Sequence, residues 1–373
     1  MISTIISSLK TLFRFFVGCL WLLKLPFKKE FYSSNTYFPE LSERRKSRLM
    51  VFIDQVHHIL KYGVPDEFYF LYGLDIKGLH KAEDFVDNKN FMRRQYAMNT
   101  KYVAFPPIPV LRDKALFGIV AEAYGINTAI NVGFIQNEYM YLFEEKRRIP
   151  LNQINSLDCF TERSDFFIKK IDGQCADGVY HMKIVDGKFY YENKIIDATV
   201  FFERKHRYLI QEAIKRQHPA ISKIHSKAIN TLRVVTVYNE KKDEIEHFST
   251  VLRVGKGDNQ VDNWAAGGLS IGVDAEKGVL RKYGFYKPGH GTKAIEHPDS
   301  HIIFENYRIP YLKEAIEQAI SFHRHLYGIH SIGWDIAITE EGPCFVEGND
   351  NWEISLMQIS NHGLMQEYNR LFY

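Results

Sequence analysis

The segment that most constrains this chain is GWDIAITEEGPCFVEGND, residues 333–350. Its two halves, DIAIT and PCFVE, alternate residue types with period two and are separated by EEG, so they predict a β-hairpin with a three-residue turn. Most of the segment is apolar enough for a protein core. The acids Asp335 and Glu347 and the amide Asn349 are therefore the residues that need an explanation.

Symmetric pairing of this hairpin predicts three opposed pairs: 335 with 347, 337 with 345, and 339 with 343. Asp335 and Glu347 would then lie opposite one another with their Cβ atoms about 5 Å apart, and Asn349 would follow on the same face. Two carboxylates at that distance repel, which favours cations between them. A small set of oxygen ligands suits Mg²⁺ better than Zn²⁺. The alternative is an exposed hairpin face with solvated acids.

Lysines that could bind phosphate occur in two earlier segments. In FFIKKIDGQCADGVY, Lys169 precedes a loop that contains Gly173 and Gly178. Backbone N–H groups in such a loop can cradle phosphates. Lys114 stands at the start of a helix that we expect over residues 114–124, a favourable position for an anion. For each lysine taken alone, an ordinary surface residue is the usual explanation.

Two arginines interrupt runs that otherwise predict buried strands. Arg233 lies in NTLRVVTV and Arg253 lies in TVLRVGKG. An arginine between apolar neighbours normally needs an anionic partner, because an unpaired buried charge is costly. That partner would be either a bound anion or a carboxylate in a structural ion pair.

Charge and cysteine content exclude some classes of protein. The net charge is +3, but residues 1–29 contain five basic residues and no acid, which leaves 43 basic and 45 acidic residues in the rest of the chain. No basic cluster in that remainder supplies a nucleic-acid-binding face, so we expect no nucleic-acid partner. The four cysteines form no CxxC pair, which argues against a zinc ribbon or a disulfide framework and favours a reducing compartment.

Residues 1–29 predict a separate, basic and amphipathic helix that ends at Pro26. Its apolar run, 15–23, is shorter than the ~20 residues that a membrane-spanning helix needs. Apolar residues recur on one side of the helix: Phe13, Phe16, Leu20 and Leu23. Two interpretations stay open, a helix that lies on an anionic membrane surface and a helix that docks on the protein's own body. We favour the first.

The rest of the chain predicts two further regions. Residues 30–104 are expected to be helical, and prolines in the sequence FPPIP mark a boundary at their end. Residues 105–373 mix short strands and helices without a regular βαβ alternation. This mixture predicts an α+β fold with antiparallel sheets.

The order of these motifs along the chain resembles the ATP-grasp superfamily. It is most similar to the sugar-transfer-associated ATP-grasp group, which is related to the alpha-L-glutamate ligases. The resemblance covers about residues 105–352. Its strongest stretches are NTLRVVTV, NWAAGGLSIGVD, HPDS and GWDIAITEEGPCFVEGN. It implies an ATP-grasp fold, in which two α+β lobes with antiparallel sheets grip ATP, with the lobe boundary near 212–215.

The resemblance also implies roles for individual residues. Lys114 and Lys169 would contact the ATP phosphates beside the loop that contains Gly173 and Gly178. The backbone of Glu212, Ala213 and Ile214, in the sequence QEAI, would meet adenine. Arg233 and Arg253 would steady the phosphoryl group during transfer. Asn263, with Gly267 and Gly268, would form part of the loop near the acceptor. Asp335, Glu347 and Asn349 would hold two Mg²⁺ ions, with Glu347 bridging them.

The sequence departs from the family pattern in the phosphate loop. Lys170 occupies a position where the family often has proline. Ala176 and Asp177 stand where glycine and a basic residue are common. A less flexible and more acidic loop is expected to bind phosphate less tightly.

The reaction implied by the resemblance is ATP-dependent ligation of a carboxylate to an amine through an acyl phosphate. The expected substrates are small molecules, such as a uronic-acid sugar and an amino acid, in the synthesis of a cell-surface polysaccharide or sugar conjugate. The expected location is the cytoplasm, with peripheral contact to the inner face of the membrane and glycosyltransferases as possible partners. Two alternatives remain: a phosphotransferase acting on a sugar hydroxyl, and a non-catalytic nucleotide-binding scaffold at the membrane.

Overall fold

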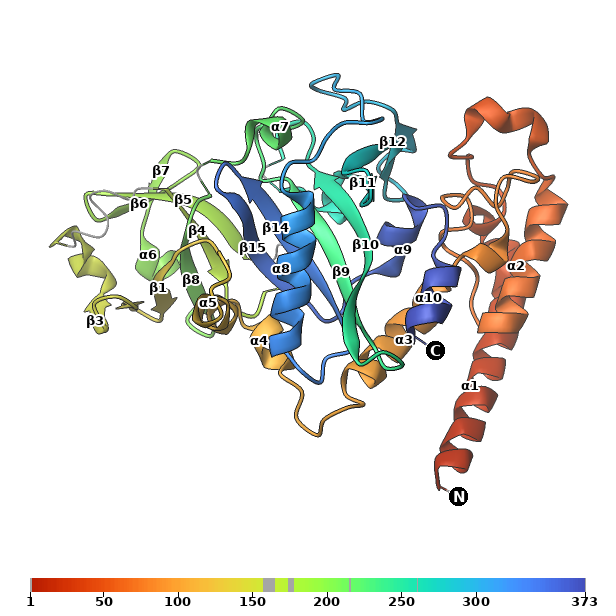
Figure 1. Cartoon of the computed structure of the whole chain (residues 1–373), viewed down its shortest axis with the longest axis horizontal. Helices are drawn as coiled ribbons and strands as arrows, with labels where there is room; N and C mark the ends of the chain where they lie inside the picture. Colours follow the sequence, from red (N-terminus) through yellow and green to blue (C-terminus); the bar gives the residue numbers. More distant parts are fainter. Residues whose placement is uncertain (1, 157–164, 174–177, 215, 260, 373) are drawn as a thin grey trace.

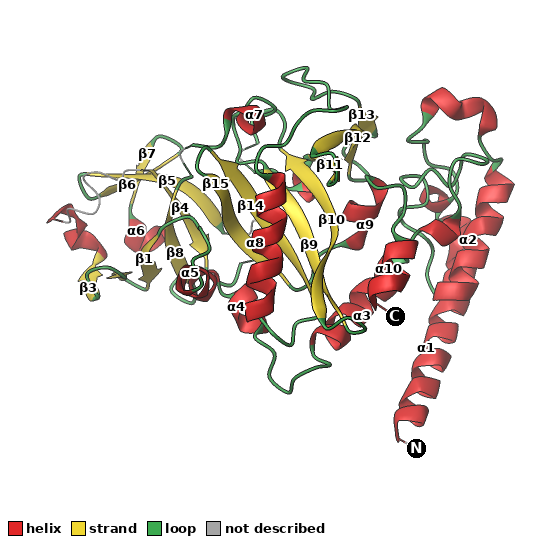
Figure 2. Ribbon diagram, in the orientation of Figure 1, coloured by secondary structure: helices red, strands yellow, loops and turns green. Residues whose placement is uncertain are grey.

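The computed structural model describes residues 2–372 except 157–164, 174–177, 215 and 260. In this part of the chain, two antiparallel sheets lie side by side and a helical N-terminal region flanks the second sheet (Figure 1). Figure 2 shows the same arrangement coloured by secondary structure, with strands concentrated in the two sheets. The expected α+β class with antiparallel sheets is confirmed.

The first sheet has eight described strands in the order β3-β2-β1-β8-β4-β5-β6-β7. Their bounds are β1 Asn131–Gln136, β2 Tyr139–Leu142, β3 Arg147–Pro150, β4 Asp165–Lys170, β5 Val179–Val185, β6 Lys188–Tyr191, β7 Lys194–Ile196 and β8 Arg207–Glu212. The apolar residues of this sheet form a core of their own, with α6 (Ala198–Phe201) against it. The sheet therefore has its own core and forms one wall of the cleft described below.

The second sheet has seven described strands in the order β13-β12-β11-β10-β9-β14-β15. Their bounds are β9 Thr231–Asn239, β10 Glu244–Val254, β11 Leu269–Asp274, β12 Val279–Tyr286, β13 Lys293–Ala294, β14 Ser331–Thr339 and β15 Gly342–Asn349. Alternate residues face opposite sides of the sheet, so Val234 and Val235 belong to different core clusters. Both faces of this sheet are covered.

The helices that cover the second sheet come from both ends of the chain. On one face, α8 (Leu312–His325) packs together with α4 (Ile108–Arg112) and α5 (Lys114–Ala123). On the other face lie α3 (Asn88–Asn99), α9 (Ile354–Ile359) and α10 (Met365–Phe372). Residues from the predicted N-terminal helical region thus share one apolar core with the sheet.

The N-terminal region is less helical than its sequence suggests. It contains α1 (Ile2–Lys24) and α2 (Arg48–Tyr62), but residues 63–87 between α2 and α3 are mostly turns. α2 begins at the cap Ser47 and ends at Gly63, whose φ of 82° favours glycine. The short helices are η1 Leu25–Phe27, η2 Lys29–Phe31, η3 Pro39–Arg44, η4 Ala82–Asp84, η5 Leu151–Ser156, η7 Trp264–Ala266 and α7 Pro219–Ser222. None of the described helices is both long and apolar enough to cross a bilayer.

The hairpin β14–β15 forms, but its register differs from the symmetric prediction. Asp335 pairs with Glu347 as expected, whereas Ala337 pairs with Cys344 and Thr339 with Gly342. The turn therefore has two residues rather than three. A β-bulge lies between the pair 335–347 and the pair 336–345, which makes Val346 the extra residue.

Candidate active site

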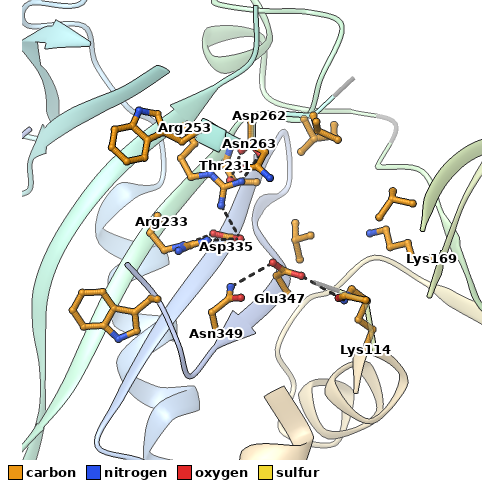
Figure 3. Close-up of a pocket in the computed structure, with 18 of the residues that line it drawn as sticks. Lys114, Lys169, Thr231, Arg233, Arg253, Asp262, Asn263, Asp335, Glu347 and Asn349 are labelled. Carbon is orange, nitrogen blue, oxygen red and sulfur yellow. Dashed lines mark hydrogen bonds and ion pairs between the residues drawn. The ribbon is translucent and has the colours of Figure 1, made fainter. Parts of the chain in front are cut away.

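A cleft of about 370 Å³ lies between the two sheets (Figure 3). Eleven of the fifteen residues to which the sequence analysis assigns a role line it: Lys114, Lys169, Gly173, Glu212, Ile214, Arg233, Arg253, Asn263, Asp335, Glu347 and Asn349. Gly267 and Gly268 are not among the lining residues. Gly178 and Ala213 are adjacent to lining residues but do not face the cleft themselves. Ala176 and Asp177, the unusual residues of the phosphate loop, lie outside the described residues.

Asp335 is the centre of a buried charge cluster in this cleft. Arg233 donates from Nε to Oδ1 at 2.5 Å and from Nη2 to Oδ2 at 2.9 Å, and Arg253 donates from Nη1 to Oδ2 at 2.9 Å. Burial raises the pKa of Asp335, but Arg233 and then Arg253 outweigh it and bring the pKa to about 2. This carboxylate is therefore ionised across the physiological pH range.

Asp262 is a site residue that the sequence analysis missed. Its Oδ1 accepts from Arg253 Nη2 at 2.7 Å, and its Oδ2 accepts from the backbone N–H of Thr231 at 2.9 Å. Burial raises the pKa of Asp262, and Arg253 opposes this shift. The signal was present, because Arg253 needed an anionic partner and the sequence VDN places an acid immediately before Asn263. Arg253 thus bridges two buried carboxylates.

The bulge in β15 decides which side chains reach the cleft. Val346 and Glu347 are consecutive, yet both line the cleft, whereas Phe345 is fully buried in the core beneath α8. A regular strand would send consecutive residues to opposite faces. The bulge therefore allows Glu347 to face the cleft while Phe345 fills the core.

Glu347, on the second sheet, lies close to Lys114, which contacts the loop that follows β4 of the first sheet. Lys114 Nζ is 4.0 Å from Glu347 Oε2, and Asn349 Nδ2 is 3.4 Å from Glu347 Oε1 (Figure 3). Lys114 also donates to the carbonyl of Gly173, and Asp113 caps the helix that Lys114 begins. Lys114 begins a helix, as the sequence predicts, and these contacts hold it against the loop that follows β4.

Lys169 approaches the cleft from the first sheet. Its Nζ donates to Gln211 Oε1 at 2.7 Å. Burial lowers the pKa of Lys169 to about 8; Glu347 opposes the shift and Lys114 adds to it. A bound anion would relieve the repulsion between the two lysines.

Among the described residues of the hinge after β8, one backbone N–H group has no hydrogen-bond acceptor. Glu212 N–H donates to Ile130 O at 2.8 Å and Ala213 N–H donates to Asp165 O at 3.1 Å. Ile214 is the hinge residue whose N–H has no acceptor among the described residues. Ile214 lines the cleft, so its N–H is the donor that a planar, nitrogen-rich ligand would meet.

Further charged and aromatic residues line the cleft. Arg112 binds Asp350 in a two-point ion pair at 3.0 and 2.7 Å, which fastens α4 to the end of β15. Lys287 Nζ lies 3.6 Å from Glu353 and 5.6 Å from the ring centre of Trp264. No sequence motif marks these residues, because their partners are distant in the chain.

The glycine-rich loop after β10 is anchored by the HPDS motif. His297 Nε2 lies 2.8 Å from the carbonyl oxygen of Gly255, and Asp299 Oδ2 accepts from Gly257 N–H at 2.6 Å. His225, His297 and Asp299 have ligand-type atoms within 4.8 Å of one another. His297 Nδ1 already accepts the N–H groups of Asp299 and Ser300. This group therefore positions the loop and is poorly suited to a metal.

The donor set of the cleft fits a hard cation. Asp335, Glu347 and Asn349 offer carboxylate and amide oxygens, the ligands that Mg²⁺ prefers. Asp335 already receives three donors from the two arginines, so a cation here would share that carboxylate with guanidinium groups. Glu347 is the less heavily paired acid of the two.

Comparison with protein families decides the affiliation. A family model described as sugar-transfer associated ATP-grasp matches residues 92–371. The chain belongs to the sugar-transfer associated ATP-grasp family. The match begins within the region predicted as helical and includes the whole cleft. No curated protein matches the chain.

Solved structures that resemble this ATP-grasp chain do so distantly. D-alanyl-alanine synthetase A from Vibrio cholerae is 12% identical over 71% of this chain and 66% of its own, with a TM-score of 0.39. VanG D-Ala:D-Ser ligase from Enterococcus faecalis is 12% identical over 70% of this chain and 61% of its own, with a TM-score of 0.40. N5-carboxyaminoimidazole ribonucleotide synthetase from Thermotoga maritima is 14% identical over 77% of this chain and 57% of its own, with a TM-score of 0.36. The matched part of this chain spans less than two thirds of these proteins.

Proposed function

We propose that this ATP-grasp chain is an ATP-dependent ligase that joins a carboxylate to an amine through an acyl phosphate. The observation that carries the proposal is the convergence, from helix α5 and the two sheets, of Lys114, Lys169 and the Arg233–Asp335–Arg253 cluster around Glu347. Phosphoryl transfer needs positioning and charge neutralisation rather than a protein nucleophile. The cleft offers that combination.

In the first step, a substrate carboxylate oxygen attacks the γ-phosphorus of ATP and the bond to the ADP oxygen breaks. Arg233 and Arg253 neutralise the negative charge on the group in transfer. Asp335 and Asp262 hold both guanidinium groups in place before substrate arrives, so little reorganisation is needed. In the second step, an amine attacks the acyl carbon, phosphate leaves, and the amine loses a proton.

Lys114 and Lys169 would bind the ATP phosphates, assisted by the loop that contains Gly173 and Gly178. Ile214 would donate its N–H to adenine, with Glu212 and Ala213 completing the hinge. Asn263, which lines the cleft, would contact the acceptor. Its Oδ1 accepts from Ala265 N–H at 2.9 Å, which fixes the orientation of the side chain.

Two Mg²⁺ ions, when bound, would neutralise phosphate charge and align the γ-phosphoryl group for attack. Asp335, Glu347 and Asn349 are the residues that would hold them. The arginines would keep Asp335 ionised and oriented for this role, because they hold its pKa at about 2.

For the substrates we propose a uronic-acid sugar and an amino acid, in the synthesis of a cell-surface polysaccharide or sugar conjugate. Support comes from the family's association with sugar transfer and from the mixed charged and aromatic lining that Lys287, Glu353 and Trp264 give the cleft. Cytoplasmic ATP would then be used near glycosyltransferases at the inner face of a membrane.

The test is magnesium-dependent ADP formation from ATP, measured with pooled sugar acids in the presence and absence of pooled amino acids. The proposal expects ADP and phosphate only when both pools are present. ADP formation with sugars alone would instead identify a phosphotransferase. ATP binding without turnover under any of these conditions would identify a nucleotide-binding scaffold.

A further inference from the structure

Helix α1 carries a stripe of exposed apolar side chains that nothing in the described structure covers. Phe13, Phe16, Leu20 and Leu23 are 41–71% exposed. Their spacing of three or four residues places them on one side of the helix. Gly18 is buried and lies on the opposite side, and Leu25, which directly follows the helix, is buried as well. The apolar stripe therefore faces away from the protein.

The exposed stripe is not explained by docking of α1 on the body. α1 does pack on α2, where a Cβ added at Gly18 would lie 3.5 Å from the carbonyl oxygen of Ile59. That contact uses the opposite side of the helix. α2 itself leaves four large apolar side chains 43–68% exposed: Leu49, Met50, Ile53 and Leu60. Exposed apolar surface of this kind marks an interaction site.

The charges around this surface are mostly positive: the acids beside it are Glu30, which lies 3.4 Å from Lys28, and Asp54 of α2, which pairs with Lys46. Arg14, Lys24, Lys28 and Lys29 are exposed, and the first acid of the chain is Glu30. Arg48 and Lys61, near the two ends of α2, are exposed as well. The remainder of the chain carries slightly more acid than base. The positive charge is therefore local to the apolar helices, and an apolar surface with basic flanks complements an anionic lipid headgroup layer.

The position of the helices leaves the cleft accessible. α1 and α2 lie at the edge of the molecule farthest from the first sheet, and the N-terminal half of α1 projects beyond the body (Figure 1). The cleft lies between the two sheets. Contact through α1 and α2 would therefore leave the mouth of the cleft open to soluble ATP.

We infer that α1 and α2 form a docking surface for an anionic phospholipid bilayer, with α1 lying in the plane of the interface. The apolar stripe enters the headgroup region and the lysines and arginines pair with lipid phosphates and carboxylates. This inference does not depend on the ligase reaction, because none of its residues lines the cleft.

The test is co-sedimentation of the full chain with phosphatidylcholine vesicles that contain or lack phosphatidylserine. The wild type is expected to pellet only with the anionic vesicles, and less as salt rises. Phe16→Asp with Leu20→Asp should abolish pelleting. Lys24→Glu with Lys28→Glu should weaken partitioning by about tenfold or more, since each basic residue near the surface contributes to binding.

Matched controls distinguish binding through this surface from non-specific hydrophobic or electrostatic binding. Phe105→Asp replaces a phenylalanine that is 95% exposed outside the two helices. Lys205→Glu with Lys313→Glu reverses two exposed lysines elsewhere. Both controls should pellet like the wild type. Equal pelleting of all variants, or none of the wild type, would overturn the inference. Sedimentation equilibrium gives a further test. If the wild type is a dimer and the Phe16→Asp, Leu20→Asp variant is a monomer, the surface binds a second copy of the chain and the inference is overturned.

Discussion

Asp335 and Arg233 form a two-point ion pair across neighbouring strands, with β14 and β9 paired at these two residues. Arg253, from β10, joins the same carboxylate and continues to Asp262. The cluster alternates positive and negative groups in a buried line. Its members are therefore positioned by one another and by the sheet, before any ligand binds.

The cluster predicts a large stability cost for removing one buried partner. Asp262→Ala leaves Arg253 with one fewer carboxylate, and we expect the free energy of unfolding to fall by about 3–5 kcal/mol, the cost typical of a broken buried ion pair. Urea denaturation measures it. Asp258→Ala is the matched control, because Asp258 pairs with Lys227 at the exposed surface, and it should leave stability unchanged. Equal stability of the two variants would show that the cluster does not hold the site together.

Glu347→Gln is expected to abolish ATP turnover while the fold is retained. The substitution keeps the size of a side chain that is partly exposed to the cleft and removes the charge that would bridge two cations. A loss of about 10²–10³-fold in kcat is the scale for losing a group that stabilises transition-state charge. Circular dichroism and the unfolding temperature provide the control. If this variant turns over ATP at the wild-type rate, Glu347 is not the metal ligand that we propose.

ATP affinity is expected to decrease as pH rises through 8. In the proposed site Lys169 binds phosphate as a cation, and burial lowers its pKa to about 8. The contribution of Lys169 is therefore complete at pH 7 and is lost progressively above pH 8. Calorimetric titration at pH 7 and pH 9 measures the decrease. In Lys169→Arg the guanidinium stays charged at both values, so a pH dependence that persists unchanged in this variant would assign it to another group.

His297→Ala is expected to lower both stability and turnover. The imidazole hydrogen-bonds to the carbonyl oxygen of Gly255 and accepts two backbone N–H groups, so its loss leaves buried polar groups unpaired at a cost of about 1–3 kcal/mol. The loop that it anchors leads to Asp262 and Asn263. His301→Ala, an exposed neighbour that pairs with Glu296, is the control. If both variants behave like the wild type, the HPDS motif has no positioning role.

Local patterns in the sequence predicted the hairpin and the opposition of Asp335 and Glu347, because strand periodicity and turn composition are properties of short segments. They did not predict the register beyond that pair. The bulge at Val346 depends on Phe345, which packs 6.0 Å from Phe322 of α8 between ring centres. A contact between residues distant in the chain thus decides the local geometry.

Local sequence patterns also could not identify the residues that pair with the predicted charged side chains. The sequence indicated that Arg253 needs an anion, but identifying Asp262 required the loop after β10 to fold back on β9. The ion pair of Arg112 with Asp350 joins residues far apart in the chain for the same reason. The packing of residues 30–104 onto the second sheet likewise follows from tertiary contacts that helical periodicity cannot show.

The most direct test of the central claim, that the cleft between the sheets binds magnesium-ATP, is calorimetric titration of the full chain with a non-hydrolysable ATP analogue. One titration contains magnesium and the other contains a chelator. We predict saturable binding at one site that requires magnesium and weakens in Glu347→Gln. Absence of binding in magnesium, or equal binding in the chelator and in Glu347→Gln, would contradict the account.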